Sequence, residues 1–210
     1  MNKNKYVVTI TRQFGSLGRP IAQSMSEKLG VEFYDRDLVD QAAKKLKLPY
    51  STVEEEEEAA EVDNTTAQAR RNPFFRMMFP FGKGTNDVQD RIFEAQQNII
   101  RFLAEKESCI IVGRCSDFIL SEVENSMHIF IYAPYEKRVE NCVKSLGMEE
   151  DEARRMILAV DEARDAYHLQ YAGYKPDDKN HKHILIDSSL LGTEGTADYL
   201  AELVKKRFGE

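Results

Sequence analysis

Residues 6–30 read YVVTITRQFGSLGRPIAQSMSEKLG, and this stretch decides the fold. The β-branched run at 6–11 predicts a strand, and the turn-forming RQFGSLGRP that follows predicts a loop. From residue 21 onward apolar side chains recur at helical spacing, and Gly30 is placed to cap the end of that helix. The opening is therefore strand, glycine-rich loop and amphipathic helix, the order in which α/β proteins bind phosphate groups.

The rest of the chain repeats the alternation of strand and helix. Alternation this regular predicts an α/β fold: a mostly parallel sheet of about five strands, covered by helices on both faces, in a single domain over residues 1–210. Further strands are expected at 31–35, 108–114, 127–133 and 183–188. Further helices are expected at 35–46, 87–106, 117–122, 149–167 and 193–208, with another beginning near Pro134–Tyr135.

Composition narrows the class of protein. With 42% hydrophobic and 31% charged residues, the chain is typical of globular proteins, and its apolar runs fall far short of the ~20 residues that span a bilayer. The N-terminus is not typical of a signal peptide. Three cysteines without a CxxC pair argue against a disulfide framework or a zinc site, and a net charge of −7 argues against general nucleic-acid binding. We therefore expect a cytoplasmic protein with no nucleic-acid or membrane partner.

Residues 51–85 differ in composition from the rest. The acidic run 54–58 is typical of a solvated helix face. A cluster of four phenylalanines and two methionines over Phe74–Phe81 favours burial, against the main body or in a homodimer, over a nucleobase platform. We interpret residues 50–86 as an insert on the acceptor side of the site.

The loop that joins the first strand to the first helix is the first candidate site. It departs from the G-x-x-x-x-G-K-[ST] pattern of P-loops, because its lysine and the Ser/Thr after that lysine are missing. Arg19 stands near the lysine's place, and Arg12 precedes the loop. A glycine-rich turn that only connects strand to helix is an equal alternative on this motif alone. The candidate phosphate ligands here are Arg12, Gly15, Ser16, Gly18 and Arg19.

A second candidate site follows the buried strand IIVGR, where Gly113 precedes Arg114. Ligands of open α/β sheets bind at the carboxyl ends of the strands, so Arg114 is expected to face the same crevice as the loop. Its guanidinium suits bidentate contact with phosphate, and an ion pair with Asp117 or Glu122 is the alternative. Asp35, at the end of the second strand, could hold an arginine, order a loop or help to bind magnesium.

A third group of charged residues lies on the helix at 149–167 and the helix before it. Asp161 and Arg164 are three residues apart and could form a simple ion pair. Taken together, the arginines suit the electrostatic clamping on which phosphoryl transfer depends. The group comprises Arg138, Arg154, Arg155, Asp161 and Arg164. The histidines show no spacing typical of a metal site.

These motifs, in this order and spacing, resemble the cytidylate kinase-like family, the bacterial relatives of cytidylate kinase. The resemblance covers nearly the whole chain. It is carried by ITRQFGSLGRPIAQSMSEKLGVEFYDRDLV, IIVGRCSDFIL, IFIYAPYEKRV, DEARDAYHLQYAGY and HILIDSSLLG.

The resemblance implies a P-loop-like nucleoside monophosphate kinase using ATP and Mg²⁺, with CMP or dCMP as the first expected acceptor. Gly15, Ser16, Gly18 and Arg19 would then hold the donor phosphates, and Gly113 and Arg114 would bind the acceptor phosphate. Residues 149–176 would form a mobile lid. The catalytic residues would be Arg19 of the loop and three arginines of the lid, Arg154, Arg155 and Arg164. Asp161, also in the lid, would contact the substrate.

The chain departs from the family pattern in two places. The loop lysine is missing, and Cys115 replaces the aspartate of Gly-Arg-Asp. Two alternatives to a nucleoside monophosphate kinase therefore stay open. One is a non-catalytic nucleotide-binding or regulatory protein, and the other is a kinase for a different small phosphate acceptor.

Overall fold

The structure is a computed structural model that describes residues 5–35 and 86–209. The chain forms two compact units, residues 1–36 with 100–210 and residues 37–99. The sheet and the candidate site belong to the first unit. The helix expected at 35–46, most of the proposed insert at 50–86 and the Phe74–Phe81 cluster lie outside the described residues.

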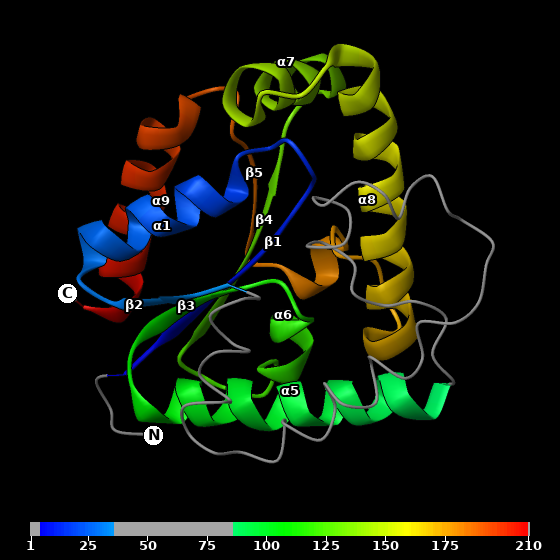
Figure 1. Cartoon of the computed structure of the whole chain (residues 1–210). Helices are drawn as coiled ribbons and strands as arrows, with labels where there is room; N and C mark the ends of the chain where they lie inside the picture. Colours follow the sequence, from blue (N-terminus) through cyan, green and yellow to red (C-terminus); the bar gives the residue numbers. More distant parts are fainter. Residues whose placement is uncertain (1–4, 36–85, 210) are drawn as a thin grey trace. The chain divides into compact units, whose positions relative to one another are not determined.

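A five-stranded, wholly parallel sheet organises the first unit, in the order β2-β3-β1-β4-β5 (Figure 1). The strands are β1 (Val7–Arg12), β2 (Glu32–Tyr34), β3 (Cys109–Val112), β4 (Ser126–Tyr132) and β5 (Ile184–Asp187). Central β1 pairs with β3 on one side and with β4 on the other. The strand order thus reverses at β1, which places a ligand crevice at the carboxyl end of this strand. The predicted fold class and all five predicted strands are confirmed.

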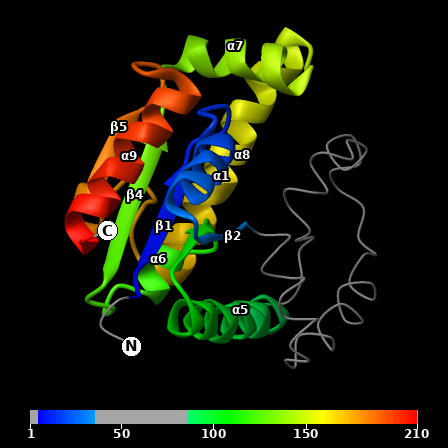
Figure 2. The same ribbon diagram turned by 90° about the vertical axis from the view of Figure 1, so that its left-hand side faces the viewer.

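Helices cover both faces of the sheet (Figures 1 and 2). They are α1 (Gly18–Leu29), α5 (Asn86–Lys106), α6 (Ser116–Ile119), α7 (Tyr135–Leu146), α8 (Glu150–Ala172) and α9 (Gly192–Phe208). The pair α1 and α9 packs on one face, and α6 and α8 lie on the other. Among the described helices, none has the length and apolar character that crossing a membrane would require.

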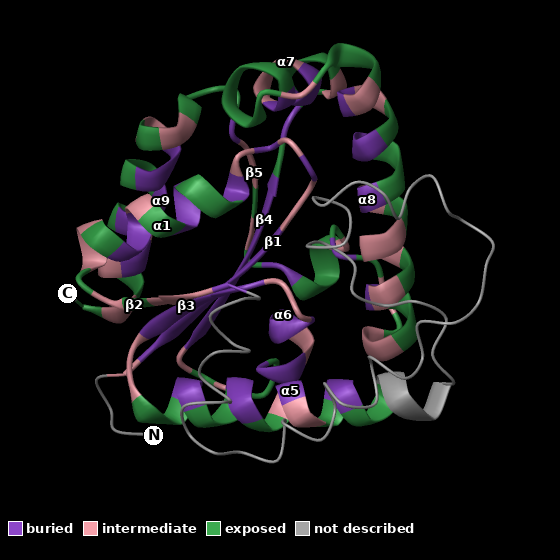
Figure 3. Cartoon of the chain, in the orientation of Figure 1, coloured by how far each residue is buried: buried purple, intermediate pink, exposed green. Residues whose placement is uncertain are grey.

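Burial on both sides of β1 explains why its sequence is an unbroken β-branched run. Val8 and Ile10 point into the main core with α1 and α9, while Val7 and Thr9 are fully buried on the opposite face. Figure 3 shows the buried strands between partly exposed helices. A strand covered on both faces needs apolar side chains at consecutive positions.

The predicted helices that fall within the described residues are present, but two of them differ from the prediction in length. Gly30 caps α1 in the left-handed conformation, as predicted. The helix predicted to end at residue 167 continues to Ala172 as one helix of 23 residues. The stretch predicted as helical over 117–122 forms only the short α6, because the chain turns directly after it.

Candidate functional site: an arginine-lined phosphate crevice

The loop between β1 and α1 presents free backbone donors at a helix N-terminus. Gly15 and Leu17 adopt left-handed conformations, with φ of 77° and 59°, and α1 begins at the next residue. Within residues 5–35 and 86–209, nothing accepts a hydrogen bond from the N–H groups of Gly15, Leu17, Gly18 or Arg19. Clustered N–H groups at the start of a helix attract anions. The loop can therefore hold a phosphate group without its lysine.

The carbonyl groups of the same loop are taken by neighbouring side chains. Asn141 of α7 donates to the Gly15 carbonyl at 2.8 Å, and Ser188 after β5 donates to the Ser16 carbonyl at 2.7 Å. The Ser16 hydroxyl donates to the carbonyl of Ile131 at 3.2 Å. These bonds fix the carbonyl side of the loop and leave the N–H side to a ligand. Ser16 therefore acts through the loop's shape in this structure, and its hydroxyl proton is already used.

A clasp of two side chains, Asp161 of α8 and Arg138 of α7, ties both helices to the loop. One carboxylate oxygen of Asp161 accepts a hydrogen bond from the Phe14 N–H at 2.7 Å, and the other is bonded to Arg138. Arg138 also donates to the Phe14 carbonyl at 3.3 Å. The distance from Arg164 to Asp161 is 4.0 Å, so the ion pair suggested by their spacing exists but is looser. Asp161 thus holds the β1–α1 loop.

Four arginines lie close together at the carboxyl end of β1, and we call this group with the β1–α1 loop the arginine crevice: Arg12 of β1, Arg19 of α1, Arg164 of α8 and Arg114 after β3. Arg164 of α8 donates to the Arg12 carbonyl at 3.0 Å. The side chain of Arg12 interacts electrostatically with Arg164, Arg19 and Arg114 and with the carboxylate of Asp35. Burial and, next, the charge of Arg164 lower the pKa of Arg12 to about 9, and burial lowers the pKa of Arg164 to about 10. Both remain cationic at neutral pH, so the crevice is strongly positive.

Arg19 and Asp35 form an ion pair next to Arg12. Their side chains form a salt bridge of 2.6 Å, in which the Arg19 side chain is 53% exposed and that of Asp35 is buried. Of the roles that the sequence left open for Asp35, the structure shows the one in which it holds an arginine. The guanidinium of Arg19 is therefore already paired with a carboxylate, and about half of its side chain faces solvent.

The turn after β3 carries three consecutive residues in the left-handed conformation. Gly113, Arg114 and Cys115 have φ of 81°, 59° and 51°. Left-handed backbone costs a non-glycine residue roughly 1–2 kcal/mol, and such strain is concentrated at functional sites. Arg114 interacts with the phenol of Tyr167 on α8. The turn brings Arg114 to the crevice, as predicted for a strand end beside β1.

Arg154 and Arg155 lie elsewhere on α8. Arg154 forms salt bridges with Glu136 and Glu150, both at 3 Å or less, and Arg155 is exposed. Arg154 is ten residues before Arg164, which corresponds to about 15 Å along a helix. The structure does not bring these two arginines to the group around Arg12.

A buried charged network beneath the crevice was not evident in the sequence. Asp117 of α6 accepts hydrogen bonds from His168 of α8 at 3.0 Å and from Tyr174 at 3.1 Å, and it is ion-paired with Lys182. The side chains of Asp117 and Lys182 are 1% and 0% exposed. Burial alone would raise the pKa of Asp117, but the bond from His168 and the charge of Lys182 outweigh it and hold this pKa below its ordinary value.

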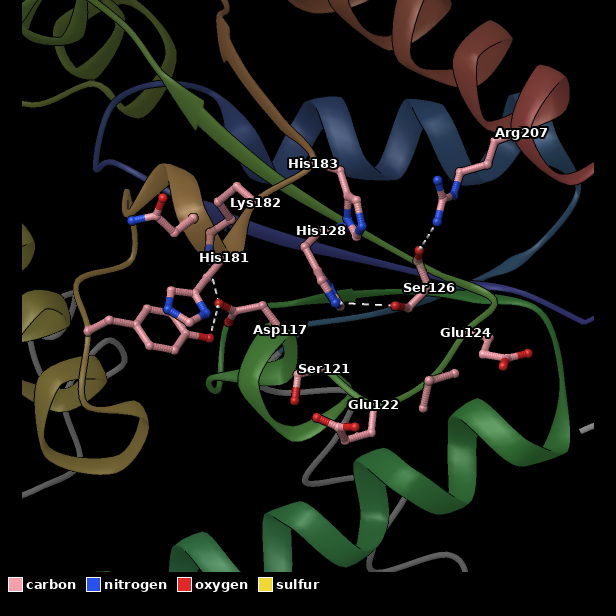
Figure 4. A pocket seen from close by; sticks show the side chains of 13 residues that line it. Asp117, Ser121, Glu122, Glu124, Ser126, His128, His181, Lys182, His183 and Arg207 are labelled. Atoms are coloured by element: carbon pink, nitrogen blue, oxygen red, sulfur yellow. Dashed lines mark hydrogen bonds and ion pairs between the residues drawn. The ribbon is translucent and has the colours of Figure 1, made fainter.

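A pocket of about 460 Å³ lies beside this network (Figure 4). Its walls are the loop between α6 and β4, the start of β4 and the segment that leads into β5. Figure 4 shows Asp117 and His181 at one end and the bond between Arg207 and Ser126 at the other. Its lining carries charges of both signs and includes histidines, whereas arginines predominate around Arg12.

Divalent-metal ligands are sparse in the part of the chain that the structure describes. It contains no group of three or more His, Cys, Asp or Glu side chains arranged to hold a metal. Asp35 is the carboxylate that the structure places near Arg12. A magnesium ion carried in on nucleotide phosphates needs only one or two protein carboxylates, so the crevice fits a metal of that kind better than a resident one.

Comparison with known proteins identifies the fold and the family of the chain. Solved structures with the same fold include an uncharacterized protein from Eubacterium ventriosum (24% identity, TM-score 0.66, covering 98% of this chain and 99% of that one). TT1252 from Thermus thermophilus (13%, 0.56, 97% and 98%) and shikimate kinase from Bacteroides thetaiotaomicron (13%, 0.51, 98% and 99%) also share it. No curated protein matches the sequence significantly. The model of the cytidylate kinase-like family matches residues 7–190, and the chain therefore belongs to the cytidylate kinase-like family.

Proposed function

We propose that the protein transfers a phosphoryl group from ATP to a nucleoside monophosphate, with CMP or dCMP as the first acceptor to test. The observation that supports this most directly is the free N–H cluster of the β1–α1 loop opposite a strand-end arginine, Arg114, in one positive crevice. Family membership supports phosphotransferase chemistry, and the choice of CMP rests on the family resemblance alone.

Each part of the crevice has a distinct role in this proposal. The N–H groups of Gly15, Leu17 and Gly18 bind the donor phosphates, and Arg114 binds the phosphate of the acceptor. Arg164 adds positive charge between them, and the clasp of Asp161 and Arg138 keeps the loop in shape. Magnesium bound with ATP would neutralise charge on the donor phosphates, and in this proposal Asp35 would leave Arg19 to contact the metal.

No protein nucleophile is required for this reaction. An oxygen of the acceptor phosphate attacks the terminal phosphorus of the donor in line, and the bond from that phosphorus to the bridging oxygen of ADP breaks. The protein contributes positioning and positive charge. A coupled assay for ADP release with ATP, magnesium and each common nucleoside monophosphate tests the proposal. Turnover that depends on the acceptor supports it, and no turnover by folded protein favours a nucleotide-binding, non-catalytic role.

Arg114→Ala should weaken acceptor binding while leaving donor binding close to wild type. Losing a charge-assisted contact of about 2 kcal/mol corresponds to a roughly 30-fold rise in the dissociation constant. Calorimetry with CMP and, separately, with ATP measures both affinities. Arg101→Ala is the matched control, because Arg101 is an exposed residue of α5. Unchanged CMP affinity in Arg114→Ala would remove Arg114 from the acceptor site.

A further inference from the structure

The side chain of Arg12 crosses from the donor loop to the acceptor turn. Arg12 is the last residue of β1. Its side chain runs past two glycines, Gly18 and Gly113. A Cβ added to Gly18, at the start of α1, would lie 2.8 Å from the Cβ of Arg12 and 3.3 Å from its Cδ. A Cβ added to Gly113, in the acceptor turn, would lie 2.9 Å from its Nη1. Both glycines therefore leave room for this one side chain.

The guanidinium of Arg12 has no partner in the part of the chain that the structure describes. No described residue forms a hydrogen bond or an ion pair with it. Its charged neighbours are Arg164, Arg19 and Arg114, with Asp35 as the opposing charge. Arg12 is partly shielded from water, and a partly desolvated cation is costly unless a counter-charge lies nearby. An anionic ligand between donor loop and acceptor turn would supply that charge.

Arg19, the residue nearest the missing lysine in sequence, is placed differently. It is bound to Asp35 at 2.6 Å, and half of its side chain is exposed. To reach a ligand Arg19 must give up a partner, whereas the side chain of Arg12 lies among the other arginines and bonds to no side chain within residues 5–35 and 86–209. The positions of the two side chains therefore favour Arg12 over Arg19 as the residue that contacts the phosphate groups in place of the loop lysine.

We propose that Arg12 is the catalytic residue that replaces the loop lysine and binds the phosphoryl group in transit between donor and acceptor. This inference rests on the proposed phosphotransferase function. Arg12 donates hydrogen bonds to the non-bridging oxygens of the transferred group while one P–O bond forms and the other breaks. Arg12 gives up no proton. The attacking phosphate oxygen loses one negative charge as its bond to phosphorus forms, and the oxygen that leaves with ADP gains one.

The test compares Arg12→Met with Arg12→Lys and Arg19→Gln. Cationic groups that stabilise phosphoryl transfer contribute about 10³-fold or more to kcat, so Arg12→Met should lose activity on that scale with a smaller change in KM. Arg12→Lys should recover part of the loss, because the charge returns without the planar fork. Arg19→Gln should lose far less. The second readout is calorimetry with inorganic tripolyphosphate, for which Arg12→Met should lose roughly tenfold in affinity if one charge-assisted contact of about 1.4 kcal/mol is removed.

The two readouts separate this inference from the proposed function. A wild-type protein that binds tripolyphosphate through Arg12 but never turns over contradicts phosphoryl transfer and leaves Arg12 as an anion ligand, not a catalytic residue. Turnover in Arg12→Met within threefold of wild type overturns the inference while the proposed function stands. If Arg12→Met does not fold, Arg12→Lys decides: wild-type kcat in Arg12→Lys, with Arg19→Gln inactive, gives the role to Arg19.

Discussion

Replacing Asp117 with asparagine is expected to lower the free energy of unfolding by about 3–5 kcal/mol, because the change leaves the charge of Lys182 buried without its partner. At about 2–4 °C per kcal/mol for a chain of this size, Tm should fall by roughly 10 °C. Thermal unfolding followed by circular dichroism measures the shift. The pKa of Asp117 is lowered in the folded state, so its stabilisation is present above pH ~4 and is lost as the pH falls further. Asp117→Asn should lack that stabilisation at every pH.

Two further variants make the result specific to buried charge. Asp165→Asn removes the carboxylate of an exposed pair with Lys175 and should leave Tm nearly unchanged. The double variant Asp117→Asn with Lys182→Met removes both charges and should recover much of the loss. A double variant less stable than Asp117→Asn alone would show that Lys182 is stabilised by something other than Asp117.

Gly15→Ala is expected to damage both the fold and the donor site. The residue has φ of 77°, and an added Cβ would lie 2.8 Å from the carbonyl oxygen of Arg138 and 3.0 Å from the Sγ of Cys142. Left-handed strain of about 1 kcal/mol and overpacking of about 1–3 kcal/mol both apply. Displacement of the loop by 1 Å can reduce turnover by about 100-fold. Urea unfolding and kcat of the same preparation give the two effects.

Gly173→Ala separates backbone strain from the steric clash. Gly173 caps α8 with φ of 79°, almost the same as Gly15, but its added Cβ would meet nothing within 4 Å. It should therefore show the strain alone, about 1 kcal/mol, with turnover retained. Equal losses of stability and activity in the two variants would mean that contact with α7 does not govern the loop.

The sequence predicts the parallel sheet and the residues that lie at the carboxyl ends of its strands. Alternating strands and helices predict where parallel strands end, and this placed Arg12, Gly15 and Arg114 at one edge before any contact was known. Periodicity serves this purpose because it depends on neighbours within a few residues.

The clasp and the buried network were not predictable by the same means. Phe14 and Asp161 are 147 residues apart, and no local pattern records that a carboxylate will meet a loop N–H. Lys182 lies between two histidines in a polar stretch, and a lysine in such a stretch is expected to be exposed. Its complete burial follows from Asp117, which comes from another part of the chain. That Asp35 holds an arginine was among the open alternatives, but only the three-dimensional contact shows that this arginine is Arg19.

One consequence of the long α8 helix concerns changes in chain length. Within two turns it supplies Asp161 to the donor loop, Arg164 to the carbonyl of Arg12, Tyr167 to Arg114 and His168 to Asp117. Deleting one residue in this stretch rotates everything beyond it by about 100°. The rotation of this one helix about its axis therefore sets its contacts to the β1–α1 loop and to the turn after β3 at the same time. Substitutions there alter one contact at a time, whereas a deletion between residues 161 and 167 would disturb the contacts to the β1–α1 loop and to the turn after β3 together.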